Sequence, residues 1–214
     1  NGLIGNVRLG CAASMAEYLL PQLAASLLER APEVRLSLSI AQDDVLKSSL
    51  RSAQLDAIIS PLHAEDPQFL TYPILQDEAV VVASVDHPIF AAPYGLADLT
   101  RYRWILPSPA VSSRRWVDNV FAAHKLTAPV VQIETNTISM LPRLIARTNL
   151  LSFLARETLQ FSQGMNRLRE VQLPETTMQR TVAVTVRAEG YLPSAAATLV
   201  SMLRENGRQF FSGD

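Results

Sequence analysis

The chain has 214 residues, 48% hydrophobic and 18% charged, which is enough apolar material for one or two folded domains. Its 19 basic and 20 acidic residues give a formal net charge of −1 without any run of Lys or Arg, so these residues hold no electrostatic surface for nucleic acid or an anionic membrane. The single cysteine, Cys11, excludes an internal disulfide, and no apolar stretch approaches the ~18 residues of a membrane span.

Short apolar strands alternate with helices along the chain. Apolar runs and apolar/polar alternation predict strands at 7–9, 34–40, 55–60, 78–84, 103–106, 130–133, 150–155 and 181–186. Between them, helical spacing and capping residues predict helices over 17–30, from Asp43 or Asp44, over 114–124, from 137–139, and over 194–205. The alternation predicts an α/β fold with largely parallel sheets.

The strand pattern also bears on domain organisation. No Gly/Ser-rich linker marks a boundary, but two lobes joined by continuous strands would need none. We therefore interpret the uniform runs at 78–84 and 181–186 as crossover strands between two lobes, with one continuous sheet as the alternative.

The residue types that enzymes use for chemistry are not grouped. GxGxxG, P-loop and GxSxG motifs are absent, and the histidines His63, His87 and His124 lack metal-ligand spacing. His87, before Pro88, is interpreted as a surface turn residue, and Cys11 as a small buried side chain. These features predict a binding module rather than an enzyme, with no metal, cofactor or catalytic residue; an enzyme acting through Cys11 or a serine is the minor alternative.

The turn between the first strand and the first helix consists of the small residues 10–14, which either hold a ligand or pack tightly. Ser14 and Glu17 fit the S-x-x-E pattern of a capping box, which predicts that Ser14 caps the helix. A helix N-terminus also attracts anions, although Glu17 would compete for the same N–H groups.

Small polar residues gather where predicted strands end and helices begin. The four turns contain Ala13 and Ser14, Asp43 and Asp44, residues 108–113, and residues 135–139. Ligands of open α/β sheets bind at the carboxyl ends of strands, so we expect these turns to line one ligand site if two lobes face each other.

Arg114 and Arg115 lie in the first turn of a predicted helix, where a cation opposes the helix dipole. Either both arginines are solvated, or one of them binds an anionic ligand with bidentate geometry.

The order and spacing of several motifs resemble the effector-binding domain of LysR-type transcriptional regulators over essentially the whole chain. The matching stretches are "GNVRLG", "LLPQLAASLLERAPEVRLSL", "LKSSLRSAQLDAIIS", "LQDEAVVVASVDHPIF", "LADLTRYRWIL" and "RTVAVTVRAEGYLPSAAATLVSMLRE". The resemblance implies two Rossmann-like subdomains of the type 2 periplasmic-binding-protein kind, joined by two crossover strands: 1–80 with 184–214, and 81–183.

The resemblance also implies a small-molecule effector in the cleft between the subdomains. With the turns above, it gives as candidate effector-binding residues Ala13, Ser14, Asp43, Ser60, Pro61, Ser108, Val111, Ser113, Arg114 and Thr137. A transport solute-binding protein with the same fold is the alternative function.

Two departures from the family pattern stand out. Residues 146–150 read "ARTNL" without the glycines usual there, so the turn needs another backbone or a left-handed Asn149. Asp43 replaces a neutral hydroxyl, and its negative charge favours a ligand hydroxyl or amine over a bare carboxylate.

The first residues, NGLIGNVRLG, lack the basic start and the long apolar stretch of a signal peptide, so a cytoplasmic protein is expected, with a mature exported protein as the alternative. The family's winged helix-turn-helix and linker helix do not occur in these residues, so DNA would be contacted only through an N-terminal domain outside this chain. The leucine faces of the 17–30 and 194–206 helices are expected to pair in a homodimer or tetramer.

Overall fold

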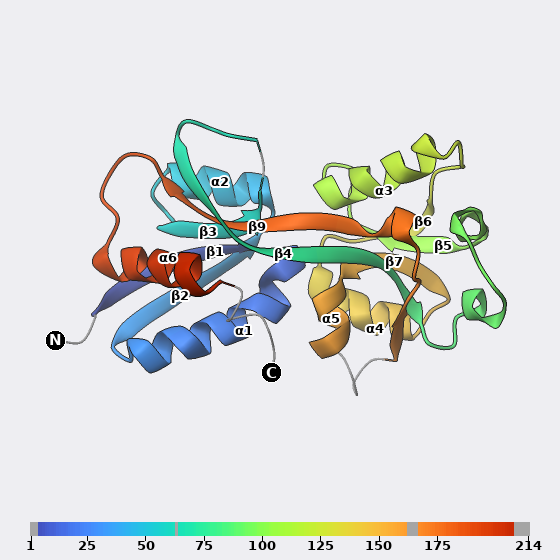
Figure 1. The fold of residues 1–214 in the computed structure, drawn as a ribbon, viewed down its shortest axis with the longest axis horizontal. Helices are drawn as coiled ribbons and strands as arrows, with labels where there is room; N and C mark the ends of the chain where they lie inside the picture. The colour runs from blue at the N-terminus through green and yellow to red at the C-terminus, as the bar shows by residue number, and fades with distance from the viewer. Residues whose placement is uncertain (1–3, 63, 162–166, 208–214) are drawn as a thin grey trace. The chain divides into compact units, whose positions relative to one another are not determined.

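The computed structural model describes residues 4–62, 64–161 and 167–207. The chain forms two compact units: unit 1 comprises residues 1–77 and 180–214, and unit 2 comprises residues 78–179. The strands β4 (Phe69–Ser84) and β9 (Met178–Arg187) are neighbours in the sheet, and each contains residues of both units (Figure 1).

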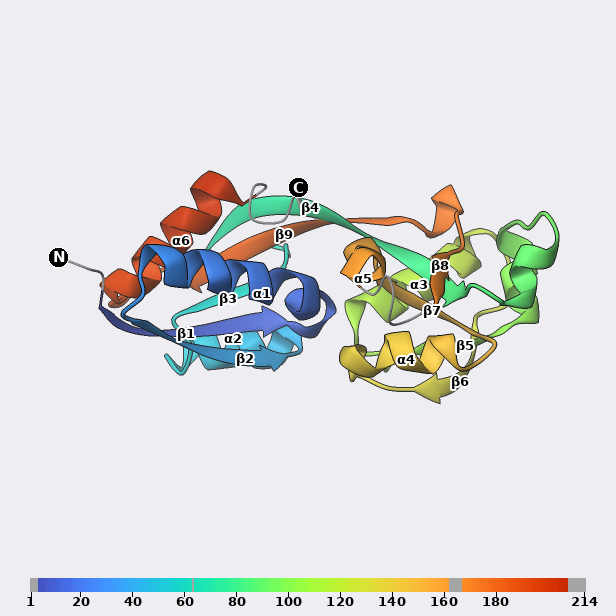
Figure 2. The same cartoon turned by 90° about the horizontal axis from the view of Figure 1, so that it is seen from below.

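Unit 1 is an α/β sandwich around a sheet in the order β2-β1-β3-β9. Its first strands, β1 (Gly5–Ala12), β2 (Val34–Ala41) and β3 (Ala57–Pro61), are mutually parallel, and β9 runs antiparallel to β3. Helices α1 (Ala13–Arg30) and α6 (Ser194–Asn206) cover one face of this sheet, and α2 (Asp43–Arg51) covers the other (Figures 1 and 2).

The core of unit 1 follows from side-chain periodicity. Val7, Leu9 and Cys11 alternate along β1 and are fully buried, and the predicted leucine stripe of α1 is buried at Leu19, Leu20, Leu23 and Leu27. On β2, by contrast, Leu38 and Ile40 are 45% and 60% exposed. The alternation predicted the strand, but β2 is the edge strand and these two side chains are exposed.

Gly10 explains the small-residue turn after β1. A Cβ atom at this position would lie 2.7 Å from Leu55 Cδ1, 2.8 Å from Leu46 Cδ2 and 3.0 Å from Ile58 Cγ2. The absence of a side chain therefore lets α2 and the following loop pack directly on β1. At Gly10, tight packing explains the small residue.

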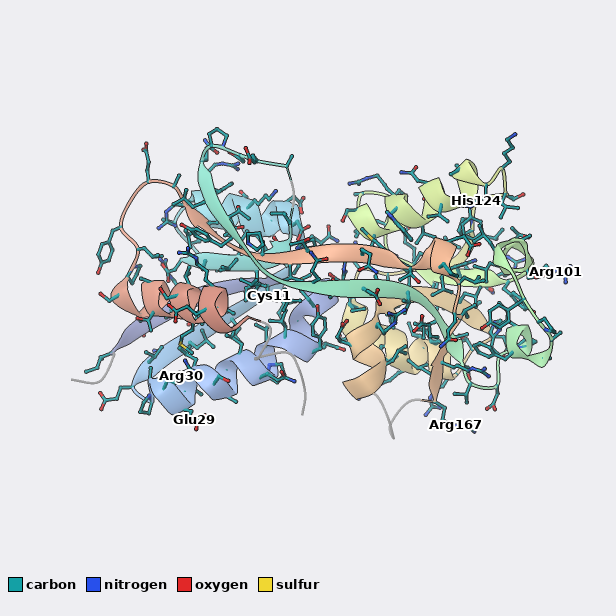
Figure 3. The ribbon with its side chains drawn as sticks, viewed as in Figure 1. Cys11, Glu29, Arg30, Arg101, His124 and Arg167 are labelled. Atoms are coloured by element: carbon teal, nitrogen blue, oxygen red, sulfur yellow. The ribbon has the colours of Figure 1, made fainter. Side chains whose placement is uncertain are left out.

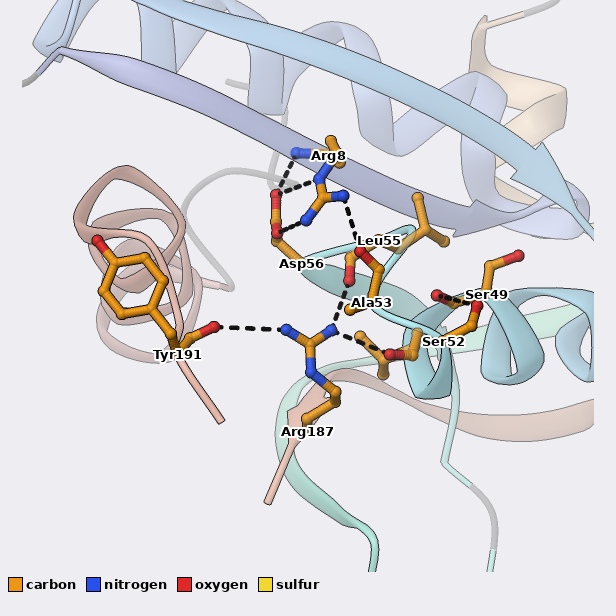
Figure 4. A network of polar contacts seen from close by, with 9 residues as sticks. Arg8, Ser49, Ser52, Ala53, Leu55, Asp56, Arg187 and Tyr191 are labelled. Carbon is orange, nitrogen blue, oxygen red and sulfur yellow. Dashed lines mark hydrogen bonds and ion pairs between the residues drawn. The ribbon is translucent and has the colours of Figure 1, made fainter. Parts of the chain in front are cut away.

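A polar network fixes the loop between α2 and β3 (Figure 4). The guanidinium of Arg8 donates to both carboxylate oxygens of Asp56, at 3.2 and 2.5 Å, and to the Ala53 carbonyl at 2.7 Å. Arg187 donates to the carbonyls of Leu50 and Leu55, at 3.0 and 2.9 Å. These side chains bind carbonyl groups at the end of α2 and in the loop after it, and the Leu50 carbonyl also accepts from the Ala53 N–H at 3.1 Å.

Unit 2 has a sheet in the order β4-β7-β5-β6, with β8 (Leu168–Glu170) paired to β4. β5 (Arg103–Leu106), β6 (Val130–Glu134) and β7 (Leu150–Ala155) are parallel, and β4 is antiparallel to β7. The helices are α3 (Ser112–Ala123), α4 (Leu141–Ala146) and α5 (Arg156–Phe161), with 3-10 turns at Pro88–Ala91, Leu96–Arg101, Ile138–Met140 and Pro174–Thr176.

Alternation along β5 divides the core of unit 2 into two layers. Trp104 and Leu106 pack in the cluster that contains Val117 and Phe121 of α3. Ile105, between them, packs in the cluster that contains Leu141 and Ile145 of α4. The sheet is therefore buried on both faces, as expected for parallel strands.

All predicted strands are present, and the predicted α/β class is confirmed. Sequence reasoning missed α5, β8 and the first nine residues of β4, 69–77. This part of β4 contains Pro73 and Asp77, which are depleted in strands. Among the described residues, no helix is long and apolar enough to cross a membrane, and no group of three metal-ligating side chains occurs.

Candidate effector site

Unit 1 brings its predicted site residues to one edge of the sheet. β1 pairs with β2 through Ala12 and Ala41, and with β3 through Cys11 and Ile59, so the three strands end side by side. Ala13, Ser14 and Asp43 follow the ends of β1 and β2, and Ser60 and Pro61 are the last two residues of β3.

The predicted capping box is wrong. β1 runs directly into α1, so Ala12 is the N-cap, Ser14 is already the second helical residue, and no side chain caps the helix. The caps predicted at Asp43 or Asp44 are also wrong, because Gln42 holds the N-cap position of α2. Both aspartates lie in the first turn, where their charge favours the helix dipole.

The hydroxyl of Ser14 instead belongs to a buried polar cluster. Arg180 Nη1 donates to Ser14 Oγ at 3.3 Å, and Arg180 Nε donates to Asp77 Oδ1 at 2.8 Å. Tyr18 Oη donates to Asp77 Oδ2 at 2.5 Å. Because Arg180 occupies a lone pair of Ser14, the hydroxyl proton of Ser14 remains for an acceptor.

Sequence reasoning missed Arg180 and Asp77. The side chains of these residues are 5% and 0% exposed, yet Arg180 lies 166 positions from Ser14 in the chain. A lone charge within an apolar strand such as "RTVAVTV" was the one available signal, because a buried arginine needs a partner.

Cys11 is a packing residue, as predicted. It is fully buried in β1. Burial, helped by the negative charge of Asp43, raises the pKa of the Cys11 thiol to about 12. A raised pKa disfavours the thiolate, which is the form that a cysteine nucleophile needs.

Unit 2 gathers its predicted site residues in the same way. Leu106 pairs with Glu134, so β5 and β6 end together, and Ser108 N donates to Asn136 Oδ1 at 3.0 Å across the two turns. The candidate residues Ser108, Val111, Ser113, Arg114 and Thr137 follow these strand ends, with Val111 as the N-cap of α3.

Arg114 has partners within the chain. Its Nε lies 2.9 Å from Asp118 Oδ2, and its Nη1 donates to the Pro107 carbonyl at 3.2 Å. With its side chain 13% exposed, Arg114 is not the solvated residue of the first interpretation. The ion pair offsets the cost of a cation at the start of α3 and leaves the anion-binding interpretation a prediction.

The interpretation of His87 as a surface residue is wrong. It is 2% exposed, its Nδ1 accepts from Ile89 N at 3.1 Å, and its Nε2 lies 3.1 Å from the Asn149 carbonyl oxygen. Burial lowers the pKa of His87, although the Asn149 contact opposes that shift.

The "ARTNL" turn at 146–150 has the first of the two predicted solutions, a different backbone. Asn149 has no positive φ, and Thr148 Oγ1 donates to the Leu144 carbonyl at 2.8 Å, which closes the turn.

Comparison with known proteins gives a consistent result. Residues 1–208 match the family described as LysR substrate binding domain. The chain is 25% identical over 205 residues to the HTH-type transcriptional regulator GalR of Pseudomonas putida, covering 95% of this chain and 52% of that protein. It is 26% identical to CbbR of Xanthobacter flavus, covering 96% of this chain and 62% of that protein. The chain thus spans about half of the first relative's length.

Solved structures share the fold. The CcmR regulatory domain of Synechocystis, in complex with 2-PG, aligns with a TM-score of 0.82 at 22% identity, over 94% of this chain and 96% of that domain. The effector binding domain of QuiR, in complex with shikimate, aligns with a TM-score of 0.82 at 18% identity, over 98% of this chain and all of that domain. With the family match over nearly the whole chain, these findings lead to one conclusion: the chain belongs to the LysR substrate-binding domain family.

Proposed function

We propose that this chain is the effector-sensing domain of a LysR-type DNA-binding transcriptional regulator. The observation that carries the proposal is the family match over residues 1–208. The curated relatives named above are transcriptional regulators, which favours regulation over the solute-binding alternative and over an enzyme. In this proposal the protein is cytoplasmic, has no catalytic residue, and contacts DNA only through a domain outside this chain.

We infer that turns at the carboxyl ends of the strands bind the effector, as the family resemblance implies. The candidates are Ser14, Asp43 and Ser60 in unit 1, and Ser108 and Thr137 in unit 2. An effector acts as a signal only by binding one arrangement of the protein more tightly than another.

The polar groups of unit 1 suggest the chemistry of the effector. Ser14 has a hydroxyl proton to donate, since Arg180 occupies one of its lone pairs. Asp43, as a carboxylate, accepts hydrogen bonds and disfavours a nearby anion. A small polar molecule with both an acceptor oxygen and a hydroxyl or amine fits this pair better than a bare carboxylate.

A thermal-shift screen over small acids, sugars and aromatic compounds tests the function. A true effector binds the native state and at a hundred times its Kd stabilises it by about 2.7 kcal/mol. Calorimetry on the hit should then show Ser14→Ala weakening binding by about five- to tenfold, as expected for one lost hydrogen bond.

Ser201→Ala is the matched control, since it removes an exposed helical hydroxyl. Thr137→Val removes a candidate hydroxyl of unit 2, and it should weaken effector binding in the same calorimetric measurement. A hit whose affinity is unchanged by both Ser14→Ala and Thr137→Val would place the effector elsewhere and contradict the proposed site.

A further inference from the structure

Unit 2 contains a cavity apart from its candidate effector turns. It has a volume of about 470 Å³, within the range of small-molecule sites. Its lining residues are Arg101, Tyr102, Arg103, Gln132, Ile133, Thr148, Asn149 and Leu150.

The cavity lies at the edge of the sheet opposite to those turns. Arg103 is the first residue of β5 and Leu150 is the first residue of β7, so the cavity lies at the amino ends of these two parallel strands and extends along β6 at Gln132 and Ile133. The candidate effector residues of unit 2, from Ser108 to Thr137, follow the carboxyl ends of β5 and β6. The cavity and the candidate effector turns are therefore separate within unit 2.

A β-bulge in β6 shapes the cavity wall. Val131 pairs with Trp104 and Ile133 pairs with Ile105, so Gln132 is the extra residue. In a regular strand Val131 and Ile133 would share a face, yet Val131 packs with the α3 cluster and Ile133 with the α4 cluster. The bulge thus lets both Gln132 and Ile133 line the cavity, and bulges commonly re-aim a side chain in this way.

The lining combines positive charge, amides and an apolar wall. Arg101 and Arg103 are both exposed, and none of the lining residues that the structure describes is a carboxylate. Arg101 has one ion pair, with Asp98 at 3.3 Å, and Arg103 has none with any residue the structure describes. Gln132 and Asn149 add amide donors, while Tyr102, Ile133 and Leu150 supply apolar surface.

His87 contacts two of the residues that line the cavity. The centroids of the His87 and Tyr102 rings lie 4.6 Å apart in an edge-to-face arrangement, and His87 Nε2 contacts the Asn149 carbonyl. Two lining residues from different segments are thereby fixed on one buried side chain, so the wall is preformed.

We propose that this cavity is a second small-molecule site, distinct from the effector site, for a small carboxylate or phosphate with a flat apolar body. The guanidinium of Arg103, assisted by Arg101, binds the anionic group, the amides of Gln132 and Asn149 orient it, and the ring or chain of the ligand lies against Ile133 and Leu150.

Backbone amide NMR of the 214-residue chain, titrated with benzoate and separately with inorganic phosphate, tests this site. Benzoate should produce saturable shifts at residues 101–103, 132–133 and 148–150, and phosphate should produce weaker shifts at the same amides. Arg103→Gln should weaken benzoate binding about tenfold, the size expected for a charge-assisted contact. Raising the salt concentration should weaken it further.

The chain provides a closely matched control. Arg101 and Arg167 are each 76% exposed, and each pairs with one aspartate, at 3.3 and 3.2 Å. Figure 3 shows them on different parts of unit 2. Arg101→Gln should weaken binding several-fold, whereas Arg167→Gln should leave it unchanged.

Several outcomes would overturn the proposal: no saturable shift with either anion, shifts confined to 108–113 and 135–139, or equal weakening by Arg101→Gln and Arg167→Gln. Because the readout is the cavity amides themselves, the result stands whether or not the effector proposal is correct.

Discussion

At the scale of single residues, unit 1 depends on two ion pairs that differ in exposure. Arg180 and Asp77 are both withdrawn from water, with side chains 5% and 0% exposed. In the other pair Asp56 is 1% exposed while Arg8 is 44% exposed. Removing a partner is costly when the remaining charge stays buried, so the two pairs should respond differently to substitution.

Arg180→Met should destabilise unit 1 by about 3–5 kcal/mol, because it leaves the Asp77 carboxylate buried without its cation. Ser14→Ala should cost only about 1 kcal/mol, since it removes one hydrogen bond. Urea unfolding measures both values. A double variant, Arg180→Met with Asp77→Leu, should recover most of the loss; if it does not, the ion pair is not the cause.

Arg8 and Asp56 should behave asymmetrically. Burial opposes ionisation of Asp56, but hydrogen bonds from Arg8 and its charge outweigh burial and hold the pKa of Asp56 below its ordinary value. Arg8→Met leaves the buried Asp56 carboxylate without its cation and should therefore destabilise the folded protein by about 2–4 kcal/mol. Asp56→Asn should destabilise it by about 1–2 kcal/mol. A depressed folded pKa gives stability that is present above pH ~4 and lost as the pH falls further, so in Asp56→Asn this acid-dependent part should disappear.

Burial of His87 predicts a second dependence of folding stability on pH, in a higher pH range than that of Asp56. Its folded pKa lies below the ordinary value of 6.5, so the unfolded chain takes up the proton first as the pH falls. Stability should therefore be full above pH 6.5 and should decline below it. Urea unfolding between pH 7.5 and 5 should show a flatter profile for His87→Gln than for the wild type. His124→Gln, at an exposed position, is the control, and an equal flattening in both variants would contradict the assignment.

At the scale of secondary-structure elements, the joint between β1 and α1 depends on close packing more than on capping. No side chain caps α1, and the contact of α2 with β1 is made over the bare backbone of Gly10. The helix is instead stabilised by the buried leucines of its inner face.

Gly10→Ala should accordingly destabilise by about 1–3 kcal/mol, the usual cost of overpacking a core, because the new Cβ would lie under 3 Å from Leu55 and Leu46. Gly95→Ala is the control, since a Cβ there has open space around it. Thermal unfolding of the two variants measures the difference. Equal melting temperatures would show that α2 shifts without cost.

At the scale of the whole molecule, the predicted pairing of subunits needs a different surface from the one first expected. The leucines of α1 at positions 19, 20, 23 and 27 and those of α6 at 199 and 203 are buried in their own unit, so they cannot serve a partner. Exposed apolar side chains of unit 1 include Leu28 of α1 and Leu38 and Ile40 of β2. An edge strand with such side chains favours association.

We expect the chain to be at least a dimer at tens of micromolar, measured by size-exclusion chromatography with light scattering. Ile40→Lys should shift it toward the monomer, because a charge would have to be buried in the contact. Val130→Lys is the control: Val130 is 46% exposed on β6, the edge strand of unit 2. A wild-type monomer, or dissociation by both substitutions, would contradict this surface.

The sequence by itself determined the α/β class, the order of the elements and the family, because apolar periodicity and motif order are properties of the chain that do not depend on its tertiary contacts. It also indicated which turns end beside one another, since the carboxyl ends of parallel strands share an edge. Only the tertiary structure decided the partners. Ser14 binds Arg180 rather than capping α1, His87 is buried, and the bulge at Gln132 opens a cavity, each through contacts between residues distant in the chain. Such contacts produce no periodic pattern in the sequence, because they depend on which helices and strands pack together and not on the spacing of residues along one element.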